Sequence, residues 1–130
     1  MEDSFFKFQQ TNIILYCRNW SDSVYFYRNR LRLPVSFEND WFVELQLTDH
    51  SYLSIANAAR ASIQDVGGQG LTLTWKVADL QQAKQRLEEL GIETTPIKQK
   101  WNAQVMFITD PEGHRIELWA NNPEQVESSA

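Results

Sequence analysis

The chain has 130 residues and a mass of 15.2 kDa, a length that is typical of one compact domain. Its 12 Lys and Arg against 17 Asp and Glu give a formal net charge of −5, which argues against a nucleic-acid partner because phosphate binding needs a basic surface. No apolar run approaches the ~20 residues of a membrane helix, no export signal is recognisable at the start, and Cys17 is the single cysteine, so we expect a cytoplasmic protein without membrane contact or internal disulfide.

The first half of the chain alternates between strand and helix patterns. Apolar runs and period-two alternation indicate strands, and apolar residues at i, i+3 and i+7 indicate a helix. Asn19 or Ser21 can cap the helix, and Pro34 cannot continue it. The expected elements are a strand at Asn12–Cys17, a helix at Ser21–Leu31, a weak strand near Val35–Phe37, strands at Trp41–Leu47 and Tyr52–Ala56, and a loop at Ala58–Gly70.

The second half repeats this order. Asp79 with Gln82 three residues later resembles a capping box, and Gly91 stands where a left-handed helix stop is expected. Asp110–Gly113 contains the Pro and Gly of a tight turn. The expected elements are a strand at Leu71–Val77, a helix at Leu80–Leu90, a weak strand near Ile92–Ile97, and a hairpin of Val105–Thr109 with Arg115–Ala120.

Two units of the same order, offset by about 60 residues, predict an internal duplication. We therefore predict an α+β fold in which two βαβββ modules form one domain at 1–122. The first module covers about residues 8–66 and the second about residues 70–120. The polar segment 123–130 reads as a C-terminal tail.

Three motifs in the predicted order resemble the vicinal oxygen chelate superfamily, which includes glyoxalase I, extradiol dioxygenases, fosfomycin-resistance transferases and bleomycin-resistance proteins. They are NIILYCRNWSDSVYFYRNRL, VADLQQAKQRLEELGI and FITDPEGHRIELWA. The first motif departs from the family at Asn19, where an Asp is usual, and at Arg32, where a Gly is usual. The resemblance implies a curved mixed sheet that forms a cup, usually within a homodimer.

The resemblance also implies four metal-ligand positions, which metal-dependent members fill with His or Glu. Matched position by position, they fall on Asn12, Ser54, Thr72 and Glu117. One carboxylate with an amide and two hydroxyls is a poor donor set for a divalent transition metal. We therefore expect no metal and no cofactor, with a divalent metal ion at Glu117 as the alternative.

Strand alternation extends this set to a whole sheet face. If the four positions line the cup, alternation also places there Ile14, Tyr16, Phe42, Glu44, Tyr52, Thr74, Lys76, Arg115 and Trp119. The opposite face then packs under the two helices, through Ile13, Leu15 and Cys17 in the first half and Leu71, Leu73, Trp75 and Val77 in the second. Trp101, in KQKWNAQ, resembles the loop that the family uses to cover the site. Tyr16 and Phe42 fit a dimer interface as well as a pocket.

The expected lining is aromatic and acidic, which is typical of a pocket for a flat small molecule and favours a cationic one. The candidate ligand-binding residues are Asn12, Tyr16, Phe42, Glu44, Tyr52, Ser54, Thr72, Thr74, Trp101 and Trp119. The two histidines read as turn residues; we expect His114 to face solvent and assign the same role to His50.

Two functions follow from this reading. The first is a metal-free binding protein that resembles the bleomycin-resistance branch and sequesters an aromatic compound in a dimeric cup. The alternative is a glyoxalase-type lyase or isomerase, in which Glu117 is the catalytic base or a metal ligand. This second function depends on family membership, because one fold hosts many chemistries.

Overall fold

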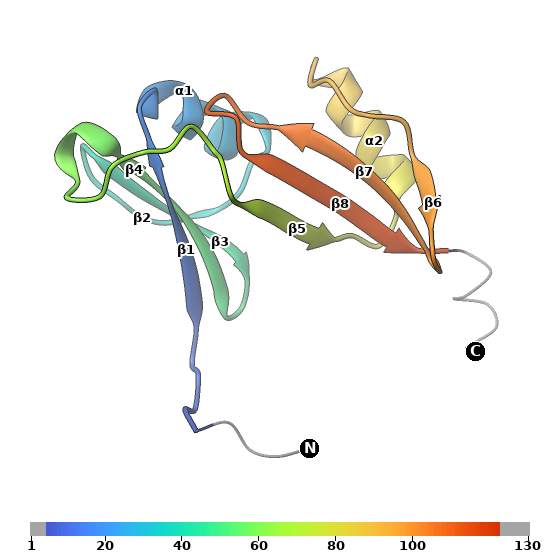
Figure 1. Cartoon of the computed structure of the whole chain (residues 1–130), viewed down its shortest axis with the longest axis horizontal. Coiled ribbons are helices and arrows are strands. Elements are labelled where there is room, and N and C mark those ends of the chain that lie inside the picture. The colour runs from blue at the N-terminus through green and yellow to red at the C-terminus, as the bar shows by residue number, and fades with distance from the viewer. Residues whose placement is uncertain (1–4, 123–130) are drawn as a thin grey trace. The chain divides into compact units, whose positions relative to one another are not determined.

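The computed structural model describes residues 5–122, which form two compact units that meet in sequence between Gly67 and Gly68 (Figure 1). Each unit contains a four-stranded sheet with one parallel and two antiparallel strand pairs. The predicted pair of βαβββ modules is therefore confirmed. The predicted tail at 123–130 lies outside the described residues.

Unit 1 has the sheet order β1-β4-β3-β2, in which β1 and β4 run parallel. The parallel pair is joined through the helix, because parallel strands need a long crossover. The elements are β1 (Thr11–Cys17), α1 (Trp20–Val24), η1 (Tyr25–Arg30), β2 (Val35–Glu38), β3 (Phe42–Thr48), β4 (Ser51–Asn57) and η2 (Ala58–Arg60).

The predicted first helix is present, but it changes pitch in the middle. After the single α-turn of α1, the chain continues as the π-helical segment η1. The backbone N–H of Leu31 donates to the carbonyl of Phe26, five residues back, at 2.9 Å. Arg32 follows with φ +59°, a left-handed conformation in which glycine has no strain. This is the position at which the related family usually has Gly.

The core of unit 1 lies between its sheet and this helical segment. Apolar side chains alternate onto the helix-facing side of each strand, and the Trp20 indole N–H donates to the Ile55 carbonyl at 2.9 Å. Ile13 was expected in this core but is 45% exposed, because burial on β1 begins only at Leu15. The buried set includes Leu15, Cys17, Val24, Tyr27, Val43, Leu45, Leu53 and Ile55.

Unit 2 repeats the arrangement with the order β5-β8-β7-β6 and a parallel β5–β8 pair. Asp79 caps the helix as predicted, with its side chain accepting from the Gln82 backbone N–H at 3.0 Å, and Gly91 follows the helix at φ +78°. The elements are β5 (Thr72–Lys76), α2 (Leu80–Glu89), β6 (Lys98–Lys100), β7 (Ala103–Thr109) and β8 (Arg115–Asn121).

The second strand of unit 2 is not where the sequence predicted it. We expected it near Ile92–Ile97, but the strand is β6, a short, fully exposed edge strand. Regular strand pairing fails at Ile92–Ile97 for two reasons. The Phe107 N–H donates to the Thr95 side-chain hydroxyl, at 2.8 Å, instead of to a backbone carbonyl, and Pro96 has no N–H to donate. A three-residue polar edge strand carries no alternation signal, which explains the error.

Helix α2 covers one face of the unit 2 sheet, where Leu80 and Leu87 pack with the buried side chains of β7 and β8. Leu71 was expected in this core but precedes β5 and is 37% exposed. Within residues 5–122, no helix is long and apolar enough to cross a membrane. The buried strand residues of this core are Leu73, Met106, Ile108, Ile116, Leu118 and Ala120.

Candidate functional site

The sheet face of unit 2 that points away from α2 carries three cross-strand pairs of polar and aromatic residues. The register of β5 and β8 sets Thr72 against Arg115, Thr74 against Glu117, and Lys76 against Trp119. Each pair is also a side-chain contact, described below. Thr72, Thr74, Glu117 and Trp119 therefore lie on one face of this sheet, as strand alternation predicted.

Glu117 occupies the middle of this face. The Thr74 hydroxyl donates to its Oε1 at 2.6 Å, and Phe107 is its register partner on β7. Glu117 is half-buried, and within residues 5–122 the hydroxyl of Thr74 is the group that donates to its carboxylate. A carboxylate held in this way has its second oxygen available to a ligand on the same face.

Two cations flank Glu117, and both lie against aromatic rings. The Lys76 ammonium nitrogen is 5.0 Å from the centroid of the Trp119 ring. The Arg115 guanidinium carbon is 4.8 Å from the centroid of the Phe107 ring, and the Arg115 Nε–H donates to the Thr72 hydroxyl at 3.1 Å. Such contacts contribute roughly 0.5–1 kcal/mol at exposed sites and favour these positions of the long side chains. The face therefore carries two positive charges and one negative charge.

The corresponding face of unit 1 carries the other predicted residues. The Ser54 hydroxyl donates to Asn12 Oδ1 at 3.0 Å, and Ser54 is fully buried. The carboxylate of Glu44 accepts from the Ser36 hydroxyl at 2.7 Å. The predicted aromatic residues of this face, which alternation and register place beside them, are half-buried: Tyr16, Phe42 and Tyr52.

The registers of the two sheets show which positions are equivalent in the duplication. In unit 1, Ser54 on β4 lies opposite Glu44 on β3. In unit 2, Glu117 on β8 lies opposite Phe107 on β7. The position-by-position match pairs Ser54 with Glu117 as ligand positions, so one unit has a hydroxyl at this position and the other a carboxylate.

These contacts test whether the four matched positions fit a metal ion. The donors of Asn12 and Ser54 are bonded to each other, and the Thr72 hydroxyl accepts from Arg115. Glu117 alone has a donor that divalent transition metals prefer. No group of three or more His, Cys, Asp or Glu able to hold a metal is found within residues 5–122. The donor set does not fit a tightly bound divalent metal.

Trp101 lies on the turn between β6 and β7. Its backbone has φ +59°, and its side chain is 92% exposed. The structure therefore places this predicted ligand-binding residue at the end of a hairpin, and its role in covering the site stays a prediction.

A hollow of about 460 Å³ lies beside the unit 2 face. It connects Phe107 and Arg115, which lie on that face, with the segment that follows α2. Arg115 was placed on this face by alternation, but it was not among the predicted ligand-binding residues. The lining residues are Glu93, Thr94, Thr95, Phe107, Ile108, Thr109 and Arg115.

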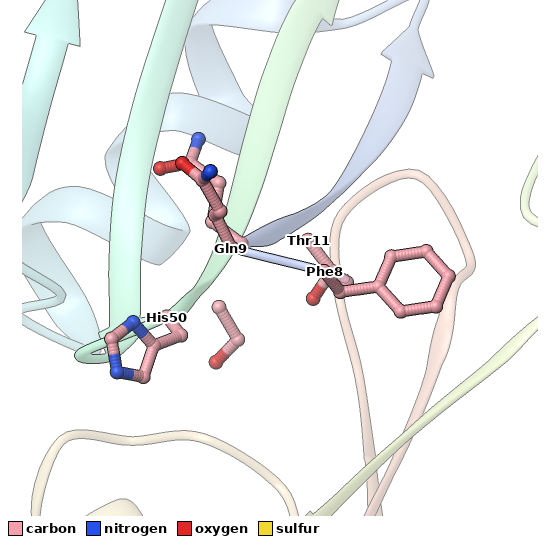
Figure 2. A pocket seen from close by; sticks show the side chains of 6 residues that line it. Phe8, Gln9, Thr11 and His50 are labelled. Atoms are coloured by element: carbon pink, nitrogen blue, oxygen red, sulfur yellow. The ribbon is translucent and has the colours of Figure 1, made fainter. Parts of the chain in front are cut away.

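A second hollow, of about 560 Å³, lies in unit 1 between the start of β1 and the β3–β4 turn. Figure 2 shows Phe8 and His50 on opposite sides of it, with Thr11 between them. The Thr11 N–H donates to the His50 carbonyl at 2.9 Å, which ties the two segments together. None of the predicted site residues lines this hollow.

His114 is the clearest departure from the sequence-based expectation. It was predicted to face solvent, but it is buried, and its Nδ1 lies 2.8 Å from Oδ2 of the buried Asp110. Oδ1 of the same carboxylate accepts from the backbone N–H groups of Glu112 and His114, at 2.9 and 2.8 Å. Asp110 and His114 thus form a buried hydrogen-bonded brace inside the β7–β8 turn. The turn motif in the sequence does not reveal this pairing.

Comparison with known sequences gives one family. The model of the glyoxalase-like domain matches residues 10–121. Among curated proteins, none matches this sequence.

Solved structures of similar fold include both enzymes and a binding protein. A lactoylglutathione lyase from Agrobacterium tumefaciens has 18% identity and a TM-score of 0.70, with 85% of this chain and 91% of that chain covered. A glyoxalase/bleomycin resistance protein/dioxygenase from Nocardioides has 20% identity and a TM-score of 0.75, covering 92% and 87%. An antibiotic binding protein from Streptomyces sp. CB03234 has 14% identity and a TM-score of 0.75, covering 93% and 100%. At these identities the likeness establishes a common fold.

Proposed function

The chain belongs to the glyoxalase-like domain family, and we propose that it is a small-molecule-binding protein that holds an aromatic compound without a tightly bound metal ion. We further propose that it acts as a homodimer. The family match confirms the resemblance to the vicinal oxygen chelate superfamily that the three sequence motifs indicated. The function itself is argued from the side chains of the two sheet faces.

The observation that carries the proposal is that the side chains at the four matched ligand positions are bonded to other side chains of the protein. Asn12 accepts from Ser54, Thr72 accepts from Arg115, and Glu117 accepts from Thr74. A catalytic metal site needs about three strong protein donors with an open position for substrate. In each unit these positions are instead hydrogen-bonded within their own sheet face, and the single carboxylate among the four is Glu117 on the unit 2 face.

The aromatic side chains of the unit 2 face supply the binding energy. Trp119 and Phe107 lie on the unit 2 face and are half-buried, so each has ring area that a flat ligand can cover. Aromatic contacts add stabilisation beyond the area that they bury. The antibiotic binding protein from Streptomyces sp. CB03234 shares this fold, which supports a binding role on such a scaffold.

One observation favours a second function, a glyoxalase-type lyase or isomerase. Glu117 is half-buried at the centre of the face and is oriented by Thr74 at 2.6 Å, an arrangement suited to a general base. In this alternative Glu117 removes a proton from a bound substrate. Turnover in the wild type that is lost in Glu117→Gln, with ligand affinity retained, would favour the enzyme over the binding protein.

The binding proposal is tested with 2-naphthalenemethanol, a neutral aromatic probe, followed by amide chemical shifts that do not depend on any one tryptophan. We expect the wild type to bind and Trp119→Ala to weaken binding about tenfold, because a ring contact and its buried area are lost. Trp119→Phe is the matched control and should keep most of the affinity, since it retains a ring. No binding by the wild type, or equal binding by the alanine variant, would contradict the proposal.

A further inference from the structure

We propose that the ligand of this face carries a carboxylate group and that Arg115 binds it. This inference rests on the proposed function, because it assumes that an aromatic compound occupies the unit 2 face. It changes the expected chemistry of that compound, since the acidic residues of the sequence had suggested a cation.

Arg115 is held in one orientation by two contacts. Its Nε–H donates to the Thr72 hydroxyl at 3.1 Å, and its guanidinium carbon lies 4.8 Å from the centroid of the Phe107 ring. Its two terminal nitrogens have no hydrogen bond or ion pair with the side chains of residues 5–122. A planar guanidinium with both terminal nitrogens available matches the two oxygens of a carboxylate.

The hollow of about 460 Å³ beside Arg115 provides room for that group. Its volume is within the range of roughly 300–1,000 Å³ that small-molecule pockets occupy. The wall at Thr95 is fixed, because the Thr95 N–H donates to the Phe107 carbonyl at 3.1 Å and the Lys84 ammonium donates to the Thr95 carbonyl at 3.0 Å. The hollow is therefore built into unit 2.

The charges on the face favour an anion over a cation. Arg115 and Lys76 face a single carboxylate, Glu117, which already accepts a hydrogen bond at 2.6 Å. In unit 1, the carboxylate of Glu44 is likewise engaged, by a serine hydroxyl at 2.7 Å. Each hydrogen bond occupies one oxygen of its carboxylate and leaves the charge in place, but on the unit 2 face two cations stand against the one carboxylate of Glu117.

The same surroundings favour a monoanion over a phosphate. Glu93 lines the hollow together with Arg115, so a doubly charged group would meet one cation and one like charge. Lys76 cannot add to Arg115 at the same group, because four residues along paired strands separate their positions by about 13 Å. When the ligand carboxylate lies at Arg115, the stretch of the face between Arg115 and Trp119 is open to the aromatic part of the ligand.

Three probes that share one ring system and differ in charge test the inference. They are 2-naphthoate, 2-naphthalenemethanol and 2-naphthylmethylamine, titrated into the wild type with amide and arginine Nε–H signals observed. We expect 2-naphthoate to bind at least about tenfold more tightly than the neutral probe, as a charge-assisted bond to arginine predicts. The Nε–H signal of Arg115 should shift with 2-naphthoate only.

Variants assign the preference to particular side chains. Arg115→Gln should remove the preference for 2-naphthoate over 2-naphthalenemethanol. The two affinities are compared within the variant, because the loss of Arg115 also changes the surroundings of the Phe107 ring and so affects both probes. Arg115→Lys should retain part of the preference, since the positive charge remains but the planar pair of terminal N–H donors is lost. Glu93→Gln should strengthen 2-naphthoate binding a few fold, because it removes a like charge from the hollow.

The outcomes separate this inference from the proposed function. Equal binding of all three probes, or a preference for 2-naphthoate that survives in Arg115→Gln, would overturn the carboxylate site while aromatic binding stands. Tighter binding of 2-naphthyl phosphate than of 2-naphthoate would replace the carboxylate by a phosphate. If none of the probes binds to the wild type, both proposals fail.

Discussion

Replacing Asp110 by alanine should destabilise unit 2 strongly, although the residue lies in a turn. Its carboxylate is fully buried, with Oδ1 accepting from the backbone N–H groups of Glu112 and His114 at 2.9 and 2.8 Å and Oδ2 2.8 Å from His114 Nδ1. Alanine removes all these contacts together and leaves a buried imidazole and buried N–H donors without their acceptor.

The magnitude follows from the bonds that are lost. A hydrogen bond to a charged group contributes roughly 1.5–3 kcal/mol, and a buried donor left unsatisfied costs about 1–3 kcal/mol. The Glu112 N–H is only part-buried and can bond to water in the variant, so the full sum is not reached. We expect Asp110→Ala to lower the free energy of unfolding by about 3–5 kcal/mol, the range found when one partner of a buried pair is removed.

Urea unfolding, followed by circular dichroism and tryptophan fluorescence together, measures this loss. Asp110→Asn should cost less, because an amide oxygen can still accept from the two backbone N–H groups. His50→Ala is the matched control, since His50 is an exposed turn histidine, and should change the free energy by no more than about 0.5 kcal/mol. An Asp110→Ala variant that loses less than about 1 kcal/mol would refute the assigned role of this brace.

Three further predictions concern the backbone and the assembly. Gly68→Ala should lower the free energy of unfolding in urea by roughly 3 kcal/mol, because the added Cβ would lie 2.4–2.6 Å from backbone atoms of the β7–β8 turn. Gly70→Ala is the matched control. It has a similar φ of +79° with nothing within 4 Å of the added Cβ, and it should cost only about 1–2 kcal/mol. Arg32→Gly should raise the free energy of unfolding by about 0.5–1 kcal/mol, since φ +59° strains any residue with a Cβ; a loss of stability would contradict this. Sedimentation should give twice the 15.2 kDa chain mass, and a monomer at micromolar concentration would exclude the proposed homodimer.

The elements with strong local signals could be predicted from the sequence. The alternation at Leu71–Val77 predicted the strand β5 (Thr72–Lys76), on which Leu73 is buried on the helix side and Thr74 is exposed on the other. Asp79 and Gly91 mark the helix ends through local hydrogen bonding and backbone conformation, which depend little on the rest of the fold. By contrast, β6 is a short polar edge strand whose pairing depends on its neighbour β7.

The candidate site was partly predictable for a related reason. Alternation placed Thr74, Glu117 and Trp119 on one face, and the strand register of β5 and β8 then made them neighbours. What alternation cannot give is which side chains bond to each other. The preorganised Arg115 depends on a hydroxyl from β5 and a ring from β7, and buried His114 depends on its pairing with Asp110 in a turn. Those contacts exist only after the sheet has formed.

The absence of a tight metal site is the central claim of this account, and one calorimetric titration tests it most directly. Chelator-treated protein is titrated with nickel, zinc and manganese, with Glu117→Gln as the control. Because the matched positions offer one carboxylate and polar groups that are bonded to one another, we predict no stoichiometric tight binding and no difference between the two proteins. Binding of one metal ion per site that is lost in Glu117→Gln would contradict the account and favour a metal-dependent glyoxalase-type enzyme.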